Sequence, residues 1–235
     1  MFKGVSKCHP SPIVPASFGT DVLDTFLRLG FGLHRGVPIP CPNAISCFLL
    51  CGDSTDVRGE FARYLGLSDD VPLARPREAS GQELQTAHTL LKDCGLEEGS
   101  TVILSPEARS GTMVHPTWWI KLRDRLQARG LGVAVNFTTR SPPISGCVPL
   151  RVSLRQLWVV SRVAGRAITL RSGTSDLLAT SGCALDVLYP VQQVGKLGRK
   201  FRDTFSVNRL WQTARAREFS IPYRPTDGLL REIVT

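Results

Sequence analysis

The feature that most constrains the fold of this chain is a repeat of short apolar strands and longer helices in its second half. Four apolar segments have the length of buried strands, and they cover residues 101–105, 132–137, 166–170 and 184–188. Segments with helical periodicity separate them, at residues 116–130, after Ser153 and at residues 174–181. Apolar strands that alternate with helices are typical of a parallel sheet covered on both faces. The sequence therefore predicts an α/β fold with a Rossmann-like, doubly wound parallel sheet.

Several boundaries of the predicted helices follow from capping residues. Ser80 and Glu83 have the spacing of a capping box and open a helix that Gly95 ends. Pro116 fits the first turn of a helix, and Ser153 caps the helix that Gly165 ends. These signals are local, so they place helices without fixing their order in space.

The repeat and its flanks predict three regions. They are residues 1–43 before the repeat, residues 44–200 as a Rossmann-like domain, and residues 201–235 as a C-terminal helical return and tail. The proline-rich residues 38–42 indicate a linker or an extended crossing, and residues 44–51 indicate a buried strand. We expect a short edge strand at 148–150, a polar basic helix at 201–217 and a peripheral segment at 218–235.

Charge is distributed unevenly along the chain, whose formal net charge is +9. Residues 1–110 sum to −3 (10 basic, 13 acidic), whereas residues 111–172 sum to +9 (10 basic, with Asp124 as the one acid). Residues 173–190 contribute −2 and residues 191–235 contribute +5. Such a field favours an anionic ligand, a nucleic acid or an acidic membrane surface, and an ordinary solvated basic face is the alternative.

Cysteines and apolar runs indicate the compartment. The seven cysteines form no CxxC pair, which favours free thiols in a reducing cytoplasm over zinc ligands. The longest apolar run, residues 44–51, is shorter than the roughly 20 residues that cross a bilayer. We expect a cytoplasmic protein, with peripheral contact to the inner face of the membrane through the basic face, and neither a metal nor a cofactor.

The strongest candidate for a binding site follows the strand at 166–170. There, Arg171, Ser172 and Gly173 lead directly into a helix. A phosphate is well bound by free backbone N–H groups at such a turn, by a hydroxyl and by the guanidinium group of an arginine. In the alternative interpretation, Ser172 is a simple N-cap and Arg171 is a surface charge at the end of the strand. Asp176 lies in the first helical turn, where it suits either the helix dipole or the hydroxyls of a ribose or sugar.

Two neighbouring strand ends supply the remaining candidates, because the carboxyl ends of parallel strands meet at one edge of a sheet. Arg109 and Ser110 are candidates to complete the phosphate site. Glu107 is a candidate for binding hydroxyls or orienting Arg109, and Asn136 for binding a base edge. A solvated loop and a turn-forming asparagine are the alternatives. No Ser-His-Asp set and no pair of catalytic carboxylates can be assembled, so the catalytic residues are unknown.

The segment 95–190 resembles the C-terminal, donor-binding half of GT-B glycosyltransferases, and is most similar to the ADP-heptose:lipopolysaccharide heptosyltransferases. The likeness includes Pro106-Glu107-Ala108 after a strand, Trp119 and Leu122 on the next helix, and the strand ending at Asn136. It continues through Leu154–Leu157 to Ser172-Gly173, Asp176-Leu177-Leu178-Ala179 and the strand ending at Pro190. At the last joint, Arg171 and Asp176 replace the Asp and His of the heptosyltransferases, and their donor-phosphate lysine falls near Met113.

The resemblance implies a metal-independent glycosyltransferase that binds the diphosphate of a nucleotide sugar and acts on a glycan or lipid-linked acceptor in cell-surface polysaccharide synthesis. In that family an N-terminal domain supplies the acceptor site and the catalytic carboxylate. The resemblance therefore implies that residues 1–43 are the remnant and crossover of an incomplete N-terminal domain, and that residues 44–200 are the nucleotide-sugar-binding domain. Two alternatives stay open. One is a catalytically inactive nucleotide-binding or interaction module, and the other is a basic nucleic-acid-binding protein. No nucleic acid is expected, because the arginines are spread over several elements without a recognisable module.

Overall fold

The computed structural model describes residues 31–34, 37–40, 75–108, 114–136, 144–191, 193–194, 199–211 and 215–235. The chain divides into two compact units. In the first unit, β1 (Phe31–His34) and β2 (Val37–Pro40) pair as an antiparallel hairpin. This pairing corrects the expectation of a linker from residue 38, and prolines fit it because both strands of a two-stranded ribbon are edges. The strand predicted at 44–51 lies outside the described residues.

The second unit is built on a six-stranded sheet in which every pairing is parallel. Its strands are β3 (Thr101–Ser105), β4 (Gly132–Asn136), β5 (Val148–Leu150), β6 (Gly165–Leu170), β7 (Ala184–Pro190) and β10 (Arg217–Ile221). Their spatial order is β10-β7-β6-β3-β4-β5. The predicted Rossmann-like α/β sheet is confirmed, including the edge strand at 148–150.

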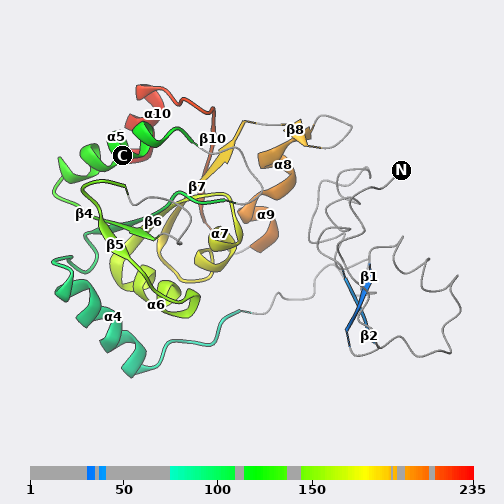
Figure 1. The fold of residues 1–235 in the computed structure, drawn as a ribbon, viewed down its shortest axis with the longest axis horizontal. Helices are drawn as coiled ribbons and strands as arrows, with labels where there is room; N and C mark the ends of the chain where they lie inside the picture. Colours follow the sequence, from blue (N-terminus) through cyan, green and yellow to red (C-terminus); the bar gives the residue numbers. More distant parts are fainter. Residues whose placement is uncertain are drawn as a thin grey trace, which may run out of the picture. The chain divides into compact units, whose positions relative to one another are not determined.

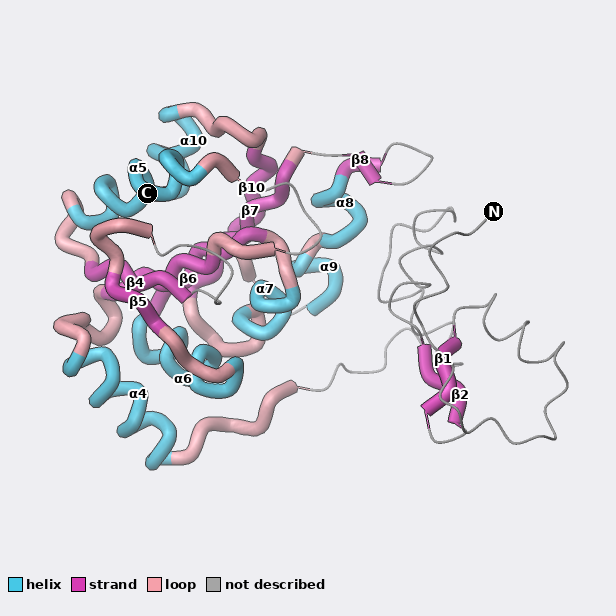
Figure 2. Tube along the Cα trace, viewed as in Figure 1, coloured by secondary structure: helices cyan, strands magenta, loops and turns pink. Residues whose placement is uncertain are grey.

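Helices cover both faces of this sheet (Figures 1 and 2). They are α4 (Gly81–Asp93), α5 (Pro116–Gln127), α6 (Leu154–Ala164), α7 (Gly173–Leu178) and α10 (Asp227–Val234). One core joins α5 and α10 to the strands, with Leu122, Leu126 and Leu230 fully buried. On the opposite face, α6 packs on β3 and β6 and is itself covered by α4. The shorter elements are β8 (Gln193–Val194), β9 (Arg199–Lys200), α8 (Phe201–Phe205) and α9 (Val207–Trp211).

The capping residues act as the sequence predicts. The Ser80 hydroxyl accepts a hydrogen bond from Glu83 N–H at 3.2 Å, and the Glu83 carboxylate accepts one from Ser80 N–H at 2.9 Å. Gly165 ends α6 at φ +95°, where a Cβ would also lie 3.1 Å from the Gly99 Cα. Both the left-handed backbone and this close approach require a glycine at that position.

The C-terminal part differs from the prediction. In place of one helix at 201–217, the structure has α8, α9 and the start of β10. Residues 218–235 are not peripheral, because Ile221 is fully buried on the sheet and α10 buries Leu230 and Ile233. Segment 217–221 alternates exposed and buried side chains, as an edge strand does, but its charged residues hide this pattern in the sequence. The segment forms a strand because it pairs with the edge of β7 that β6 does not occupy. This pairing exists only in the assembled sheet, so the sequence of the segment alone does not predict β10.

A buried carboxylate fixes the amino-terminal edge of the sheet. Asp186 in β7, whose side chain is 3% exposed, lies 2.6 Å from Arg166 Nη2 in β6 and 2.6 Å from Arg217 Nε in β10. Both arginines also donate to the carbonyl oxygen of Ile233 in α10. Three adjacent strands and the last helix are thereby joined through one carboxylate.

Candidate functional site

The strand order places a topological switch point between β3 and β6. From β3 the chain moves outward to β4 and β5, and from β6 it moves the other way to β7 and β10. The chain therefore reverses its direction across the sheet between these two neighbouring strands. Ligands of open parallel sheets bind at such a point. The candidate residues after these two strands are thus on the part of the sheet best suited to hold a ligand.

The joint between β6 and α7 is organised by the buried hydroxyl of Ser175. Its Oγ accepts a hydrogen bond from Ser172 N–H at 3.1 Å and donates to the Leu170 carbonyl at 3.1 Å. It also lies 2.9 Å from the Thr169 hydroxyl. A serine hydroxyl offers one donor and two acceptor sites, so these three bonds saturate it. Ser175 therefore fixes the turn that carries the predicted site residues.

Arg171 is held within the same joint rather than extended into solvent. It is 9% exposed, and its Nη1 donates to Asp176 Oδ2 at 2.9 Å and to the Ser172 carbonyl at 2.7 Å. The predicted neighbours Arg171 and Asp176 thus form an ion pair of opposite charges. This pairing orients the guanidinium and leaves the joint less positive than an isolated arginine would make it.

Two polar atoms at the joint are left without a partner. Ser172 Oγ and Asp176 Oδ1 are both inaccessible to solvent, and neither makes a hydrogen bond to any described residue. Ser172 precedes α7 and forms a capping-box arrangement with Ser175, but its hydroxyl is not within hydrogen-bond geometry of the backbone N–H groups that start the helix. A buried polar atom without a partner costs free energy, so this pair of atoms marks a position where a ligand group would be stabilising.

Gly173 begins α7 with an ordinary helical backbone, so its conformation does not require a glycine. A Cβ at this position would have no atom within 4 Å. The open space means that a ligand can approach the backbone there, which fits the predicted role. Arg171, Ser172, Gly173 and Asp176 all lie in this one joint, because they fall within six consecutive residues of the chain.

The neighbouring strand ends carry the other candidates. Asn136, at the end of β4, donates to Ser105 Oγ at the end of β3 over 3.2 Å. This bond uses one of its two amide donors, so Asn136 is already tied to the β3 end. Glu107 follows β3 and is half-buried. Arg109 and Ser110 lie outside the described residues, so their part in the site stays a prediction.

A further cluster, between the carboxyl end of β7 and the start of β10, was not predicted. Tyr189 donates to Glu218 Oε1 at 2.6 Å, and the same carboxylate accepts from Ser206 Oγ and from Val207 N–H at 2.8 Å. Burial, and then the Glu218 carboxylate, raise the pKa of Tyr189 far above its ordinary value. Tyr189 therefore stays a neutral donor. Only the pairing of β7 with β10 brings these residues together. The role of Ser175, in contrast, could have been predicted from the sequence, because it lies three residues after Ser172 and so has the spacing of a capping pair.

Within the described ranges, no three His, Cys, Asp or Glu side chains gather as metal ligands. Among the cysteines that the structure describes, Cys94, Cys147 and Cys183 are free thiols. Burial raises the pKa of Cys147 to about 11, so this thiol is a poor nucleophile at neutral pH. None of the described helices is both long and apolar enough to cross a membrane.

No protein-family model matches the sequence, and no curated protein matches it. Two solved structures do resemble its fold. The structure of E. coli ADP-heptose lps heptosyltransferase II is 18% identical, with a TM-score of 0.51, over 72% of this chain and 55% of that one. E. coli heptosyltransferase WaaC with ADP is 16% identical, with a TM-score of 0.45, over 76% of this chain and 54% of that one. The match thus spans about half the length of these structures, and this chain has a heptosyltransferase-like fold.

Proposed function

We propose that this chain is a glycosyltransferase-like protein that binds the diphosphate of a nucleotide-sugar donor at the switch point between β3 and β6. The observation that carries the proposal is the pair of unpartnered polar atoms, Ser172 Oγ and Asp176 Oδ1, at the end of β6. A hydroxyl that donates to a phosphate oxygen and a carboxylate oxygen that accepts from a sugar or ribose hydroxyl together fit a nucleotide sugar.

Each candidate residue has a role in this proposal. Ser172 and the backbone at Gly173 bind the diphosphate, and Asp176 Oδ1 binds a hydroxyl. Arg171, held by Asp176 Oδ2, lies beside the diphosphate and stabilises the charge that develops on it as the leaving group. Arg109 and Ser110 assist from the loop after β3, while Glu107 and Asn136 contact the sugar or the base.

The finer features of the function also belong to the proposal. The similarity to ADP-heptose lps heptosyltransferase II supports the fold, and at 18% identity it does not carry the donor with it. We propose a role in cell-surface polysaccharide synthesis with a glycan or lipid-linked acceptor, at the inner face of the membrane. Transfer requires an acceptor site and a base, and none of the described candidates is placed as that base.

Calorimetry with a panel of nucleoside diphosphates and nucleotide sugars tests the proposal on the full chain. Ser172→Ala removes a hydroxyl that makes no hydrogen bond to any described residue, so a loss of affinity would report a ligand contact and not a folding defect. We expect the affinity to fall about fivefold, as for one hydrogen bond. Ser145→Ala is the matched control, because Ser145 is exposed and precedes β5, the edge strand three strands away from β6. Absence of binding, or equal binding by the two variants, would refute the proposed site.

A further inference from the structure

A cavity lies on the face of the sheet that α5 and α10 cover. It has a volume of about 350 Å³ and is lined by His115, Thr117, Trp118, Lys121, Arg224 and Pro225. The lining comes from the start of α5 and from the loop between β10 and α10. The β6–α7 joint lies elsewhere, since α7 packs against α6, which covers the other face of the sheet.

The walls of this cavity come from two segments about one hundred residues apart that are firmly joined. His115 N–H donates to the Tyr223 carbonyl at 3.0 Å, and the two rings meet edge to face with centroids 5.6 Å apart. These contacts hold Arg224, the next residue, beside α5. Trp118 is 3% exposed, so it forms a rigid wall. A cavity of this volume with fixed walls is within the range of small-molecule sites.

Two cations give the cavity its charge. Arg224 is exposed and has no ion-pair partner among the residues described. Lys121 Nζ lies 3.5 Å from Asp227 Oδ1, but both side chains are about 60% exposed, at 62% and 59%. An exposed ion pair at this distance contributes little, so Lys121 can turn to another anion at low cost. The cavity therefore carries more positive than negative charge.

Neutral donors complete the lining. The His115 Nδ1 accepts a hydrogen bond from Thr117 N–H at 3.3 Å, and it lies 2.7 Å from the Thr117 hydroxyl. Because Nδ1 accepts, the proton of a neutral His115 ring is on Nε2, which is then a donor. The indole Nε1–H of Trp118 is buried and has no partner within the described part of the chain. The lining residues thus include one buried donor without a described partner, Trp118 Nε1–H, and two cations, and this combination suits an anion with several acceptor oxygens.

We infer that this cavity binds the phosphate group of a small phosphorylated ligand, at a site separate from the switch point of the sheet. Lys121 and Arg224 bind the phosphate oxygens, and Asp227 weakens binding because it competes for Lys121. Tyr223, which is 50% exposed, offers a ring surface beside the phosphate to the remainder of the ligand. This inference goes beyond the proposed function and does not rest on it.

The indole resonances of the full chain provide a direct test, because the sequence has only four tryptophans. In a titration with inorganic phosphate and with glucose 1-phosphate, followed by ¹H–¹⁵N NMR, we expect the Trp118 indole signal to shift and to saturate. The Trp158 signal should stay in place, because its Nε1–H is bonded to Thr180 on the α6 side. Uncharged glucose should cause no shift. A Trp118 signal that does not respond to either phosphate compound would overturn the inference.

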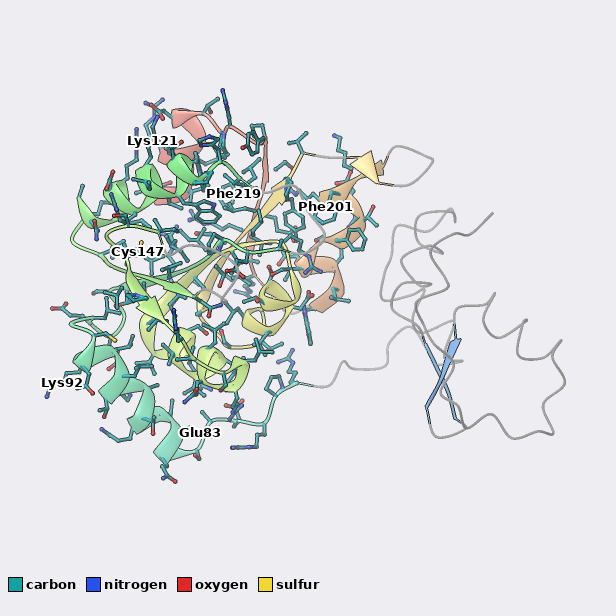
Figure 3. All side chains as sticks on the ribbon, viewed as in Figure 1. Glu83, Lys92, Lys121, Cys147, Phe201 and Phe219 are labelled. Carbon is teal, nitrogen blue, oxygen red and sulfur yellow. The ribbon has the colours of Figure 1, made fainter. Side chains whose placement is uncertain are left out.

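Charge variants make the test specific. Lys121→Ala and Arg224→Ala should each weaken phosphate binding about tenfold, as expected for the loss of a charge-assisted hydrogen bond. Asp227→Asn should strengthen it about threefold by releasing Lys121. Lys92→Ala is the matched control, because it removes one positive charge from α4 on the opposite face (Figure 3). Equal affinities of the Lys92→Ala and Lys121→Ala proteins would refute the site.

A last comparison separates this cavity from the donor site. Phosphate binding that shifts Trp118 should be unchanged in the Ser172→Ala protein, because Ser172 lies at the end of β6. If Ser172→Ala abolishes the Trp118 shift, the phosphate binds at the switch point and the second site does not exist. If the donor panel fails to bind but the Trp118 shift remains, the proposed function fails and this inference stands.

Discussion

Replacing Ser175 by alanine tests whether this hydroxyl holds the β6–α7 joint together. The variant leaves the Ser172 N–H and the Thr169 hydroxyl, both now buried beside an apolar methyl, without the partner they have in the native protein. Each buried polar group left unsatisfied costs about 1–3 kcal/mol, and alanine returns about 0.5 kcal/mol through its helix propensity. With two such groups, we therefore expect Ser175→Ala to lower the free energy of unfolding by about 1.5–5.5 kcal/mol.

Urea unfolding followed by circular dichroism measures this difference. Ser172→Ala is the matched control in the same turn, because the Ser172 hydroxyl makes no hydrogen bond to a described residue. Its free energy of unfolding should stay within about 0.5 kcal/mol of the wild type. If the two variants lose the same stability, or if Ser172→Ala loses more, the hydrogen-bond arrangement described for the joint is wrong. The conclusion that Ser172 Oγ has no hydrogen-bond partner among the described residues would then be wrong as well.

Two further predictions concern ion pairs outside the joint. Asp186→Ala should lower the free energy of unfolding by about 3–5 kcal/mol, because Arg166 and Arg217 lose the buried carboxylate that pairs with both. Urea unfolding that gives a loss of less than about 1 kcal/mol would contradict this. Hydrogen bonds from Arg155, and then from the Ser80 backbone, hold the pKa of Glu83 well below its ordinary value of 4.5. The stabilisation from Glu83 is therefore present above pH 4.5 and is lost as the pH falls below it, so the stability gap between wild type and Glu83→Gln should narrow from pH 7 to pH 3.

The helix ends and the class of fold could be predicted because their causes are local. Ser80 bonds to Glu83 three residues away, and Gly165 ends α6 through its own backbone angle. Site residues within one turn, such as Ser172 and Asp176, could be found for the same reason. The pairing of Arg171 with Asp176 was missed, since the sequence places two charges near each other without saying whether they contact each other or a ligand.

Other features could not be predicted because they depend on partners distant in the chain. Tyr189 and Glu218 are 29 residues apart and meet only because β10 pairs with β7. Similarly, the Arg224 side of the cavity meets α5 through the bond between His115 and Tyr223. Segment 217–221 gives a weak strand signal, and it becomes a strand because an edge of β7 is free.

The sequence by itself determined that this chain forms an α/β sheet, since strand and helix periodicities are properties of neighbouring residues. It also determined which short segments carry polar groups at strand ends. Only the tertiary structure decided the order β10-β7-β6-β3-β4-β5, and with it the switch point between β3 and β6. That order follows from which apolar faces and strand edges bury one another best, and this is a property of the whole assembled sheet and not of any one segment.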